Sequence, residues 1–326
     1  MTLPSGIRRW IGPVLAVVAV TIALFLVGRT LGRYSLAEIG QSVATVPGTR
    51  LAAAAAFAAA SYFCLTLFDT IAVRLAGGDL PYPRIALASF VSLSIGHNVG
   101  LAALSSGAVR YRYYRYWGLS AGQIARVIVL CGVTVGLGLA TLGGIALATH
   151  PSLAEEVTGL GGAAVAVLAA ACLALPLAYV AAAAVLRRPL RIRRWSIAVP
   201  PVRAALAQIA VGAANFACVA ACLHQTLAAV AEVQYPAVAA VYVIANVSSI
   251  LSHVPGGLGV IESVVLVLLR DESLIGALVL FRVVYYFVPL AIGVTLLLAT
   301  EAIRRSRPGM ATDGAGRRRT ALAQEP

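Results

Sequence analysis

The sequence predicts an all-α polytopic membrane protein, and three observations indicate this fold class. First, 60% of the 326 residues are hydrophobic and 11% are charged, whereas soluble domains carry roughly 25% charged residues. Second, apolar stretches of about 20 residues, long enough to cross a bilayer as a helix, follow one another along the chain. Third, all 25 basic residues are arginine, and they are dispersed between these stretches. This distribution favours cytoplasmic loops beside anionic headgroups over contact with nucleic acid.

Hydropathy alone indicates about eight spans, of which six are expected to cross the membrane fully. These six comprise residues 11–27, 51–73, 124–148, 163–186, 204–231 and 274–300. The apolar regions 85–109 and 236–269 are interrupted. We expect a cytosolic N-terminus over residues 1–10, a single transmembrane domain over 11–300, and an Arg-rich, disordered cytosolic tail over 301–326.

Loop charges predict the orientation of the spans. The basic loops at residues 110–115 and 187–194, together with the tail, are assigned to the cytoplasm. The loop with Glu155 and Glu156 contains no basic residue and is assigned to the outside. With these assignments, each interrupted region must enter and leave the membrane on the same side.

The interrupted regions are therefore predicted to be two broken hairpins of opposite orientation. The first would be broken near Gly96-His97-Asn98, and the second at Pro255-Gly256-Gly257. This pattern is typical of an inverted repeat with a site near the membrane midplane. The alternative is eight ordinary spans, with the second hairpin crossing twice in short helices. The basic loop over residues 29–50 leaves that alternative open.

The second break is the leading candidate site. Pro255, Gly256, Gly257 and Gly259 interrupt an apolar run where a helix would otherwise continue. Backbone released at membrane depth must be satisfied by protein or by a water-filled cavity. Glu262 follows one turn later, and an intramembrane carboxylate indicates a functional site. The alternative interpretation is a plain loop at the membrane interface.

Arg282 lies eight residues into the last span and needs a partner at that depth. Glu262 is its expected partner, either as a structural ion pair or as a gate that a lipid phosphate opens by competing for Arg282. Gly259 to Glu262 open a half-helix whose N-terminus favours an anion. Asp69, near the end of the second span, is interpreted as interfacial.

A second group of candidates belongs to the first hairpin. Arg110 follows Gly107, whose backbone would let a headgroup approach, and arginine binds phosphate in a bidentate manner. The neighbouring arginines and tyrosines are interpreted as an interfacial anchor. His97 and His253 each lie at a proposed break and could donate to a phosphate. We expect no metal site, because the four histidines are scattered, and no cofactor.

Two further motifs receive structural interpretations. Gly118-Leu119-Ser120-Ala121-Gly122 matches a nucleophile-elbow pattern but lacks the required strand. Ser120 with Gln123 is instead predicted to cap the following helix. The pairs at residues 28/32 and 132/136 are glycines four positions apart, predicted to pack helices within the chain.

Three motifs in order resemble the lysylphosphatidylglycerol synthase/flippase transmembrane family. The stretch 105–120 is similar to its "SGG-x-x-RxxxYxxxGls" motif, although Ser106 stands where the family usually has glycine. Residues 255–262 resemble its "PGGlGxxE" motif, and residues 281–286 its arginine in the last core span. The resemblance covers roughly residues 10–305 and implies a stand-alone member without the aminoacyltransferase domain.

The resemblance implies a lipid flippase of the bacterial inner membrane rather than an enzyme. The predicted partners are lipids with an anionic or zwitterionic phosphate headgroup, which would pass through a polar cavity at the midplane. The alternative is a non-transporting accessory protein that scaffolds a lipid-, hopanoid- or glycolipid-modifying enzyme. The expected substrate-binding residues are Arg110, Gly107, His253, Gly256, Gly257, Gly259, Glu262 and Arg282.

Overall fold

The structure is a computed structural model that describes residues 46–99, 102–186, 190–192, 195–197 and 200–306. Several predictions lie outside these ranges. They concern the N-terminus, the span 11–27, the glycine pair 28/32, part of the basic loop 187–194, and the tail beyond residue 306.

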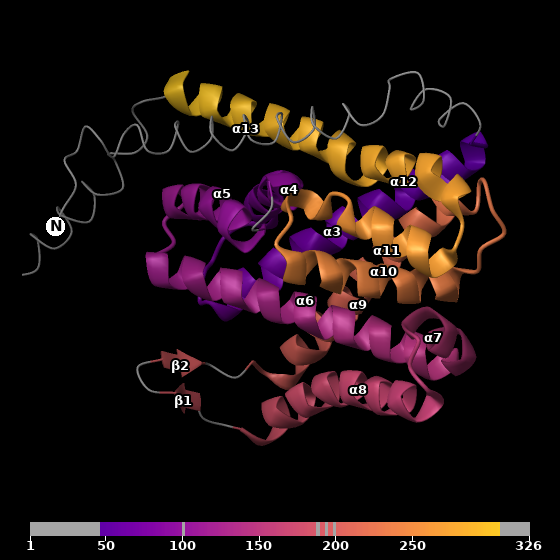
Figure 1. The fold of residues 1–326 in the computed structure, drawn as a ribbon. Helices are drawn as coiled ribbons and strands as arrows, with labels where there is room; N and C mark the ends of the chain where they lie inside the picture. Colours follow the sequence, from indigo (N-terminus) through magenta and orange to yellow (C-terminus); the bar gives the residue numbers. More distant parts are fainter. Residues whose placement is uncertain (1–45, 100–101, 187–189, 193–194, 198–199, 307–326) are drawn as a thin grey trace, which may run out of the picture.

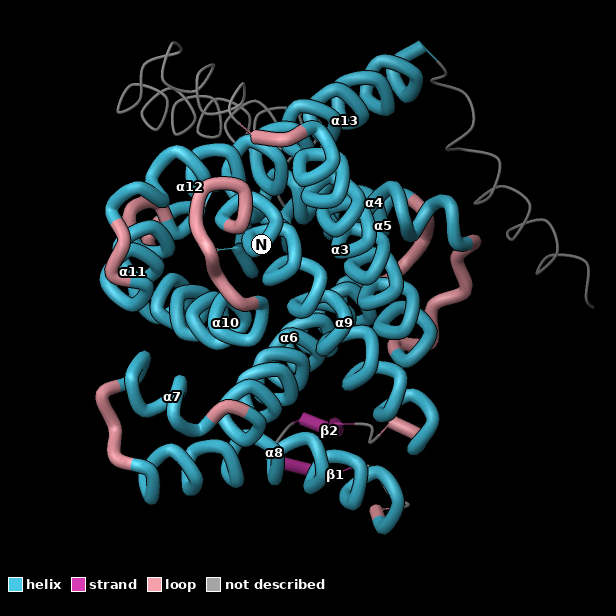
Figure 2. Tube along the Cα trace, turned by 90° about the vertical axis from the view of Figure 1, so that its right-hand side faces the viewer, coloured by secondary structure: helices cyan, strands magenta, loops and turns pink. Residues whose placement is uncertain are grey.

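The described residues form a helical bundle, which confirms the all-α polytopic class (Figure 1). Six helices are long and apolar enough to cross a membrane in the described part of the chain. They are α3 (Gly48–Leu75), α6 (Ala121–Thr149), α8 (Gly162–Val185), α9 (Val202–Leu227), α10 (Tyr235–Ser252) and the segment Ile275–Ile303. Helix α3 packs along α9, and α6 packs against both α8 and α9. Figure 2 shows α8 at the edge of the bundle, away from α3 and α12.

Close packing between α6 and α9 depends on two glycines. A Cβ atom at Gly138 would lie 2.5 Å from the carbonyl carbon of Gly212, so no larger residue fits there. The prediction for Gly132 and Gly136 was wrong: both are exposed, and a Cβ at either would meet nothing within 4 Å. Glycines four positions apart lie on one face of a helix, as packing requires, but this face of α6 points away from its neighbours.

The first hairpin consists of α4 (Tyr82–Val99) and α5 (Ala102–Tyr116), which pack against each other. The predicted break at residues 96–98 was placed too early, because α4 continues through them to Val99. Gly96 does not break the helix but lets α4 and α5 pack closely. A Cβ atom added at Gly96 would lie 2.8 Å from the Cβ of Ser106 on α5.

The second hairpin confirms the predicted break. Helix α10 ends at Ser252, a short helical turn η1 covers Pro255–Gly257, and α11 runs from Val260 to Leu269. The arms are unequal: α10 has 18 residues and α11 has 10. The turn needs glycine, because Gly256, Gly257 and Gly259 have φ angles of 62°, 58° and 82°.

The last span is not the uninterrupted helix that we predicted. After a short turn η2 (Glu272–Leu274), helix α12 (Ile275–Arg282) passes into a π-helical stretch η3 (Val283–Phe287) and then α13 (Val288–Ser306). Side chains of other helices bind carbonyl groups of this stretch. The Tyr62 hydroxyl donates to the Tyr285 carbonyl at 3.4 Å, and the Asn98 amide donates to the Tyr286 carbonyl at 3.3 Å.

The arrangement of the ends agrees with the loop charges. Figure 1 shows α7 (Pro151–Thr158) at one end of the bundle. The strands β1 (Leu190–Ile192) and β2 (Trp195–Ile197), the α5–α6 connection and the C-terminal end of α13 lie at the other. A salt bridge between Arg112 and Glu301 joins α5 to α13 at that end. The loops assigned to the cytoplasm therefore share one end, whereas the side of the membrane that this end faces stays a prediction.

The two hairpins enter the bundle from opposite ends. Helix α4 begins and α5 ends at the end of the bundle that carries β1 and β2 (Figure 1). At the base of this hairpin, the side-chain amide of Gln123 donates to the Gly77 carbonyl at 2.9 Å. Helix α10 begins and α11 ends at the end that carries α7 (Figure 1). Their opposite directions are those expected from the parity of the spans, and their descent from an inverted repeat stays a prediction.

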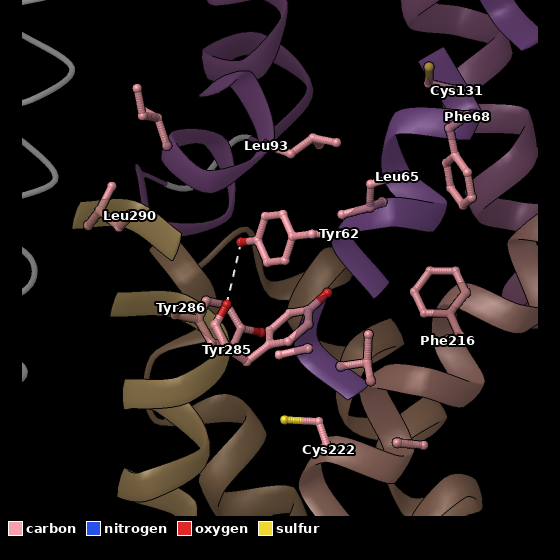
Figure 3. Packing of buried hydrophobic residues seen from close by; sticks show 14 of the residues in the cluster. Tyr62, Leu65, Phe68, Leu93, Cys131, Phe216, Cys222, Tyr285, Tyr286 and Leu290 are labelled. Atoms are coloured by element: carbon pink, nitrogen blue, oxygen red, sulfur yellow. Dashed lines mark hydrogen bonds between the residues drawn. The ribbon is translucent and has the colours of Figure 1, made fainter. Parts of the chain in front are cut away.

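Aromatic side chains of α3, α9 and η3 pack together in the core of the bundle. Figure 3 shows Tyr62 of α3, Phe216 of α9, and Tyr285 and Tyr286 of η3 within one cluster of buried side chains. The Ser61 hydroxyl donates to Asn215 at 2.8 Å and also contacts the Tyr285 hydroxyl at 2.9 Å. Polar groups in this core are therefore paired across three elements.

Candidate functional site

An ion pair joins the broken hairpin to the last span, as the sequence predicted. Arg282 Nε donates to Glu262 Oε1 at 2.6 Å, and Arg282 Nη2 donates to Glu262 Oε2 at 2.9 Å. The two side chains are 3% and 15% exposed. This bidentate geometry is the strong form of an arginine–carboxylate pair.

The turn at the break supplies further partners for the same guanidinium. Arg282 Nη2 donates to the Gly257 carbonyl at 2.8 Å, and Nη1 donates to the Gly256 carbonyl. The guanidinium also lies over the Tyr286 ring, 4.7 Å from its centre. Because the glycines adopt positive φ angles, their carbonyls point toward Arg282 and do not continue the helix.

Glu262 is held by the helix that follows the turn. The amide of Gly259 donates to Glu262 Oε2 at 2.9 Å at the first turn of α11. The carboxylate thus satisfies one of the free amides at a helix N-terminus while it neutralises Arg282. An anion at this place would meet both a guanidinium and a helix N-terminus.

The two hairpins meet at this turn. A Cβ atom at Gly256 would lie 3.4 Å from the carbonyl oxygens of both His97 and Asn98, near the C-terminal end of α4. The structure therefore brings the two regions of the predicted breaks together, although α4 continues through residues 96–98.

A second buried ion pair lies between the first hairpin and α3. Arg110 Nε and Nη2 donate to the two oxygens of Asp69 at 2.8 and 2.7 Å, and the hydroxyls of Tyr114 and Ser89 donate to the same carboxylate at 2.7 and 2.9 Å. The interfacial interpretation of Asp69 was wrong, because its side chain is 0% exposed.

Sequence reasoning missed Asp69 because its partner is 41 positions away and no spacing links them. The available signal was Arg110 itself. An arginine buried in an apolar bundle needs a carboxylate, and Asp69 is the acidic residue of the span that precedes this hairpin.

Besides Arg110, which is paired with Asp69, two other candidate residues stand apart from the Arg282 pair. Gly107 lies within α5 and faces Ile128 of α6, so it packs helices and does not form an open loop. His253 is exposed at the end of α10, where its ring nitrogen Nδ1 lies 2.8 Å from the Leu251 carbonyl. Gly256, Gly257, Gly259, Glu262 and Arg282 form one hydrogen-bonded cluster.

The loop that leaves α11 is ordered by its own hydrogen bonds. The hydroxyl and the amide of Ser273 donate to Asp271 Oδ1 at 2.6 and 2.9 Å. These bonds lower the pKa of the exposed Asp271 carboxyl below its ordinary value.

This bundle, with six described helices long and apolar enough to cross a membrane and buried arginine–carboxylate pairs beside broken hairpins, is that of a multi-pass membrane protein. No family model matches the chain. It is 33% identical over 290 residues to "Uncharacterized protein slr0712" of Synechocystis sp., a match that covers 88% of this chain and 90% of that protein. It is also 27% identical over 249 residues to "Inner membrane protein YbhN" of Escherichia coli, covering 74% and 77%. The chain belongs to the family of the Synechocystis protein and is a multi-pass protein of the inner membrane.

A shorter similarity supports the predicted resemblance in part. Over 61 residues, the chain is 43% identical to "Phosphatidylglycerol lysyltransferase" of Staphylococcus epidermidis. This match covers 17% of the chain and 7% of that enzyme. The similarity therefore concerns a small part of a much longer protein.

Proposed function

We propose that this chain moves a lipid with a phosphate headgroup across the inner membrane, and that the Arg282–Glu262 pair is the gate. The observation that carries the proposal is the set of partners of Arg282. A buried guanidinium is held by one carboxylate and by two carbonyls of a glycine turn, which all act as acceptors.

Phosphate chemistry fits this arrangement. A phosphodiester presents two anionic oxygens to arginine with the same bidentate geometry as a carboxylate. The headgroup can therefore replace Glu262 as the partner of Arg282 without leaving the guanidinium unpaired. When the lipid departs, Glu262 returns and restores the closed pair, which avoids the cost of an isolated buried charge.

The glycine turn explains how a headgroup reaches the arginine. Gly256, Gly257 and Gly259 carry no side chain to screen Arg282, and the N-terminus of α11 lies beside it. The acyl chains would stay in the bilayer, because the outer faces of the helices are apolar. The passage consists of binding and release, and the proposal assigns no covalent step and no cofactor to the chain.

The similarity to the Staphylococcus enzyme guides the choice of the lipid to test. The name of the Staphylococcus enzyme indicates that it acts on phosphatidylglycerol. Phosphatidylglycerol is accordingly the first lipid to test.

The test measures the accessibility of fluorescent phosphatidylglycerol in liposomes to an external quencher that does not cross the membrane. Wild-type protein is expected to equilibrate the label between the leaflets. The variant Glu262→Gln should slow equilibration by about tenfold or more, because a charge-assisted bond worth about 1.5–3 kcal/mol is lost. Glu156→Gln, an exposed carboxylate on α7, is the matched control and should transport like wild type.

Two outcomes would contradict the proposal. Equal transport by wild type and Glu262→Gln would show that the Arg282–Glu262 pair is not the gate. No equilibration of phosphatidylglycerol by any variant would favour the accessory alternative, in which the chain scaffolds a lipid-modifying enzyme.

A further inference from the structure

His97 lies where the two hairpins meet, and the transport mechanism above does not use it. It belongs to the last turn of α4, and its carbonyl faces Gly256 of the glycine turn. Its ring stacks on Tyr285 with centroids 6.3 Å apart, and it meets the edges of Tyr62 and Tyr286 at 6.2 and 6.4 Å. The imidazole is therefore enclosed by side chains from α3 and η3.

One ring nitrogen of His97 has no partner in the described part of the chain. Nδ1 is buried, and no described protein group hydrogen-bonds to it. Buried polar atoms in native proteins usually have a hydrogen-bond partner. A buried atom without one therefore needs an explanation, and a functional role is one such explanation. An imidazole nitrogen is a place where a proton can be gained or lost near neutral pH.

The charged and titratable groups around His97 come from each packed element. From α3 and η3 they are the hydroxyls of Tyr62, Tyr285 and Tyr286. On α12, Arg282 lies on the ring of Tyr286 and is paired with Glu262 of α11. Arg110 of α5, paired with Asp69, is the cation whose field reaches His97.

These pairs balance in the closed state. Each arginine has its own carboxylate, so a proton on His97 would be an extra positive charge within the field of Arg110. When a phosphate takes the place of Glu262 at Arg282, a negative charge is added beside Tyr286, whose ring contacts both Arg282 and His97. A proton on His97 then balances that charge.

We propose that His97 is a proton-binding site coupled to the headgroup site, so that proton uptake accompanies the binding of an anionic lipid. The inference rests on the proposed function and gives it a means of coupling to the proton gradient. Linkage makes the effect reciprocal: the lipid raises proton affinity by the same factor by which the proton raises lipid affinity. We expect a factor of about ten, within the usual range for coupled sites.

The test counts protons when a short-chain lipid binds. Dihexanoylphosphatidylglycerol is titrated into the protein in dodecyl maltoside, a detergent without phosphate. Calorimetry in buffers of different ionisation enthalpy gives the number of protons taken up. At a pH near the titration of His97, wild type should take up roughly half a proton per lipid, the most that a tenfold coupling allows, and its affinity should fall by about tenfold in total as the pH rises through that titration.

Variants identify the group that takes the proton. His97→Gln and His97→Asn should bind the lipid with no proton uptake and with an affinity independent of pH. His150→Gln changes a histidine between α6 and α7, outside the site, and should behave like wild type.

The outcomes separate this inference from the function on which it rests. Lipid binding by wild type without proton uptake, or uptake that persists in both His97 variants, overturns the role of His97 and leaves the transport proposal intact. No binding of the lipid by wild type overturns both.

Discussion

At the scale of single residues, the two buried ion pairs differ in how fully the carboxylate is bound. Asp69 accepts from Arg110, Tyr114 and Ser89 and is 0% exposed. Glu262 accepts from Arg282 and the Gly259 amide and is 15% exposed. Asp69 therefore has the features of a permanent structural anion, whereas Glu262 has those of a partner that can be exchanged.

This difference predicts losses of stability of different size for two similar substitutions. Asp69→Asn should destabilise the protein by about 3–5 kcal/mol, because it leaves Arg110 buried without its countercharge. Glu262→Gln should cost less, because the carbonyls of Gly256 and Gly257 still bind Arg282. Thermal unfolding in detergent measures both changes, and Asp79→Asn, at an exposed carboxylate, is the control. Equal loss of stability in the first two variants would show that the pairs do not differ in this way.

At the scale of elements, the sequence predicted those features that a local signal encodes. Pro255 and the adjacent glycines predicted the break in the second hairpin. The depth of Arg282 predicted its pairing with Glu262, and Ser120 with Gln123 forms the expected capping box. The packing role of Gly96 could not be read locally, because it depends on Ser106 lying opposite on another helix.

The missed features depend on contacts between distant segments. The exposure of Gly132 and Gly136 follows from the rotation of α6, which its neighbours set. The π-helical stretch after Arg282 has no composition that marks it, and its carbonyls are bound by Tyr62 and Asn98 of the first two described helices. Tertiary partners, not propensity, explain both cases.

The glycine turn provides a prediction at the same scale. Gly257→Ala should lower stability by about 1–2 kcal/mol, since its φ of 58° is strained for a residue with a Cβ. The added methyl would also meet Ser249 and Ile261, so we expect slower lipid equilibration as well. Gly132→Ala, at an exposed helical glycine, is the control and should be neutral or stabilising by up to about 1 kcal/mol. Normal stability and normal transport of Gly257→Ala would show that the turn tolerates a side chain.

At the scale of the whole molecule, the charge pattern and the helix directions predict one orientation. In a cysteine-free background, Glu156→Cys should react with an impermeant thiol reagent added outside intact spheroplasts. Gly118→Cys, in the α5–α6 connection at the opposite end, should react only after the membrane is opened. Labelling of both positions from outside would contradict the parity of spans on which the hairpin topology depends.

The short arm of the second hairpin has a consequence for the bilayer itself. The ten residues of α11 rise about 15 Å, roughly half of a hydrocarbon core of about 30 Å. From this length we expect the glycine turn near the middle of the core, at a depth set by α11 and not by the thickness of the surrounding lipid. In a membrane of longer acyl chains, the extra thickness must be accommodated by tilt or local thinning around the bundle. If the proposed transport occurs, the thickness of the host bilayer should then set how far a headgroup travels through lipid before it reaches the glycine turn.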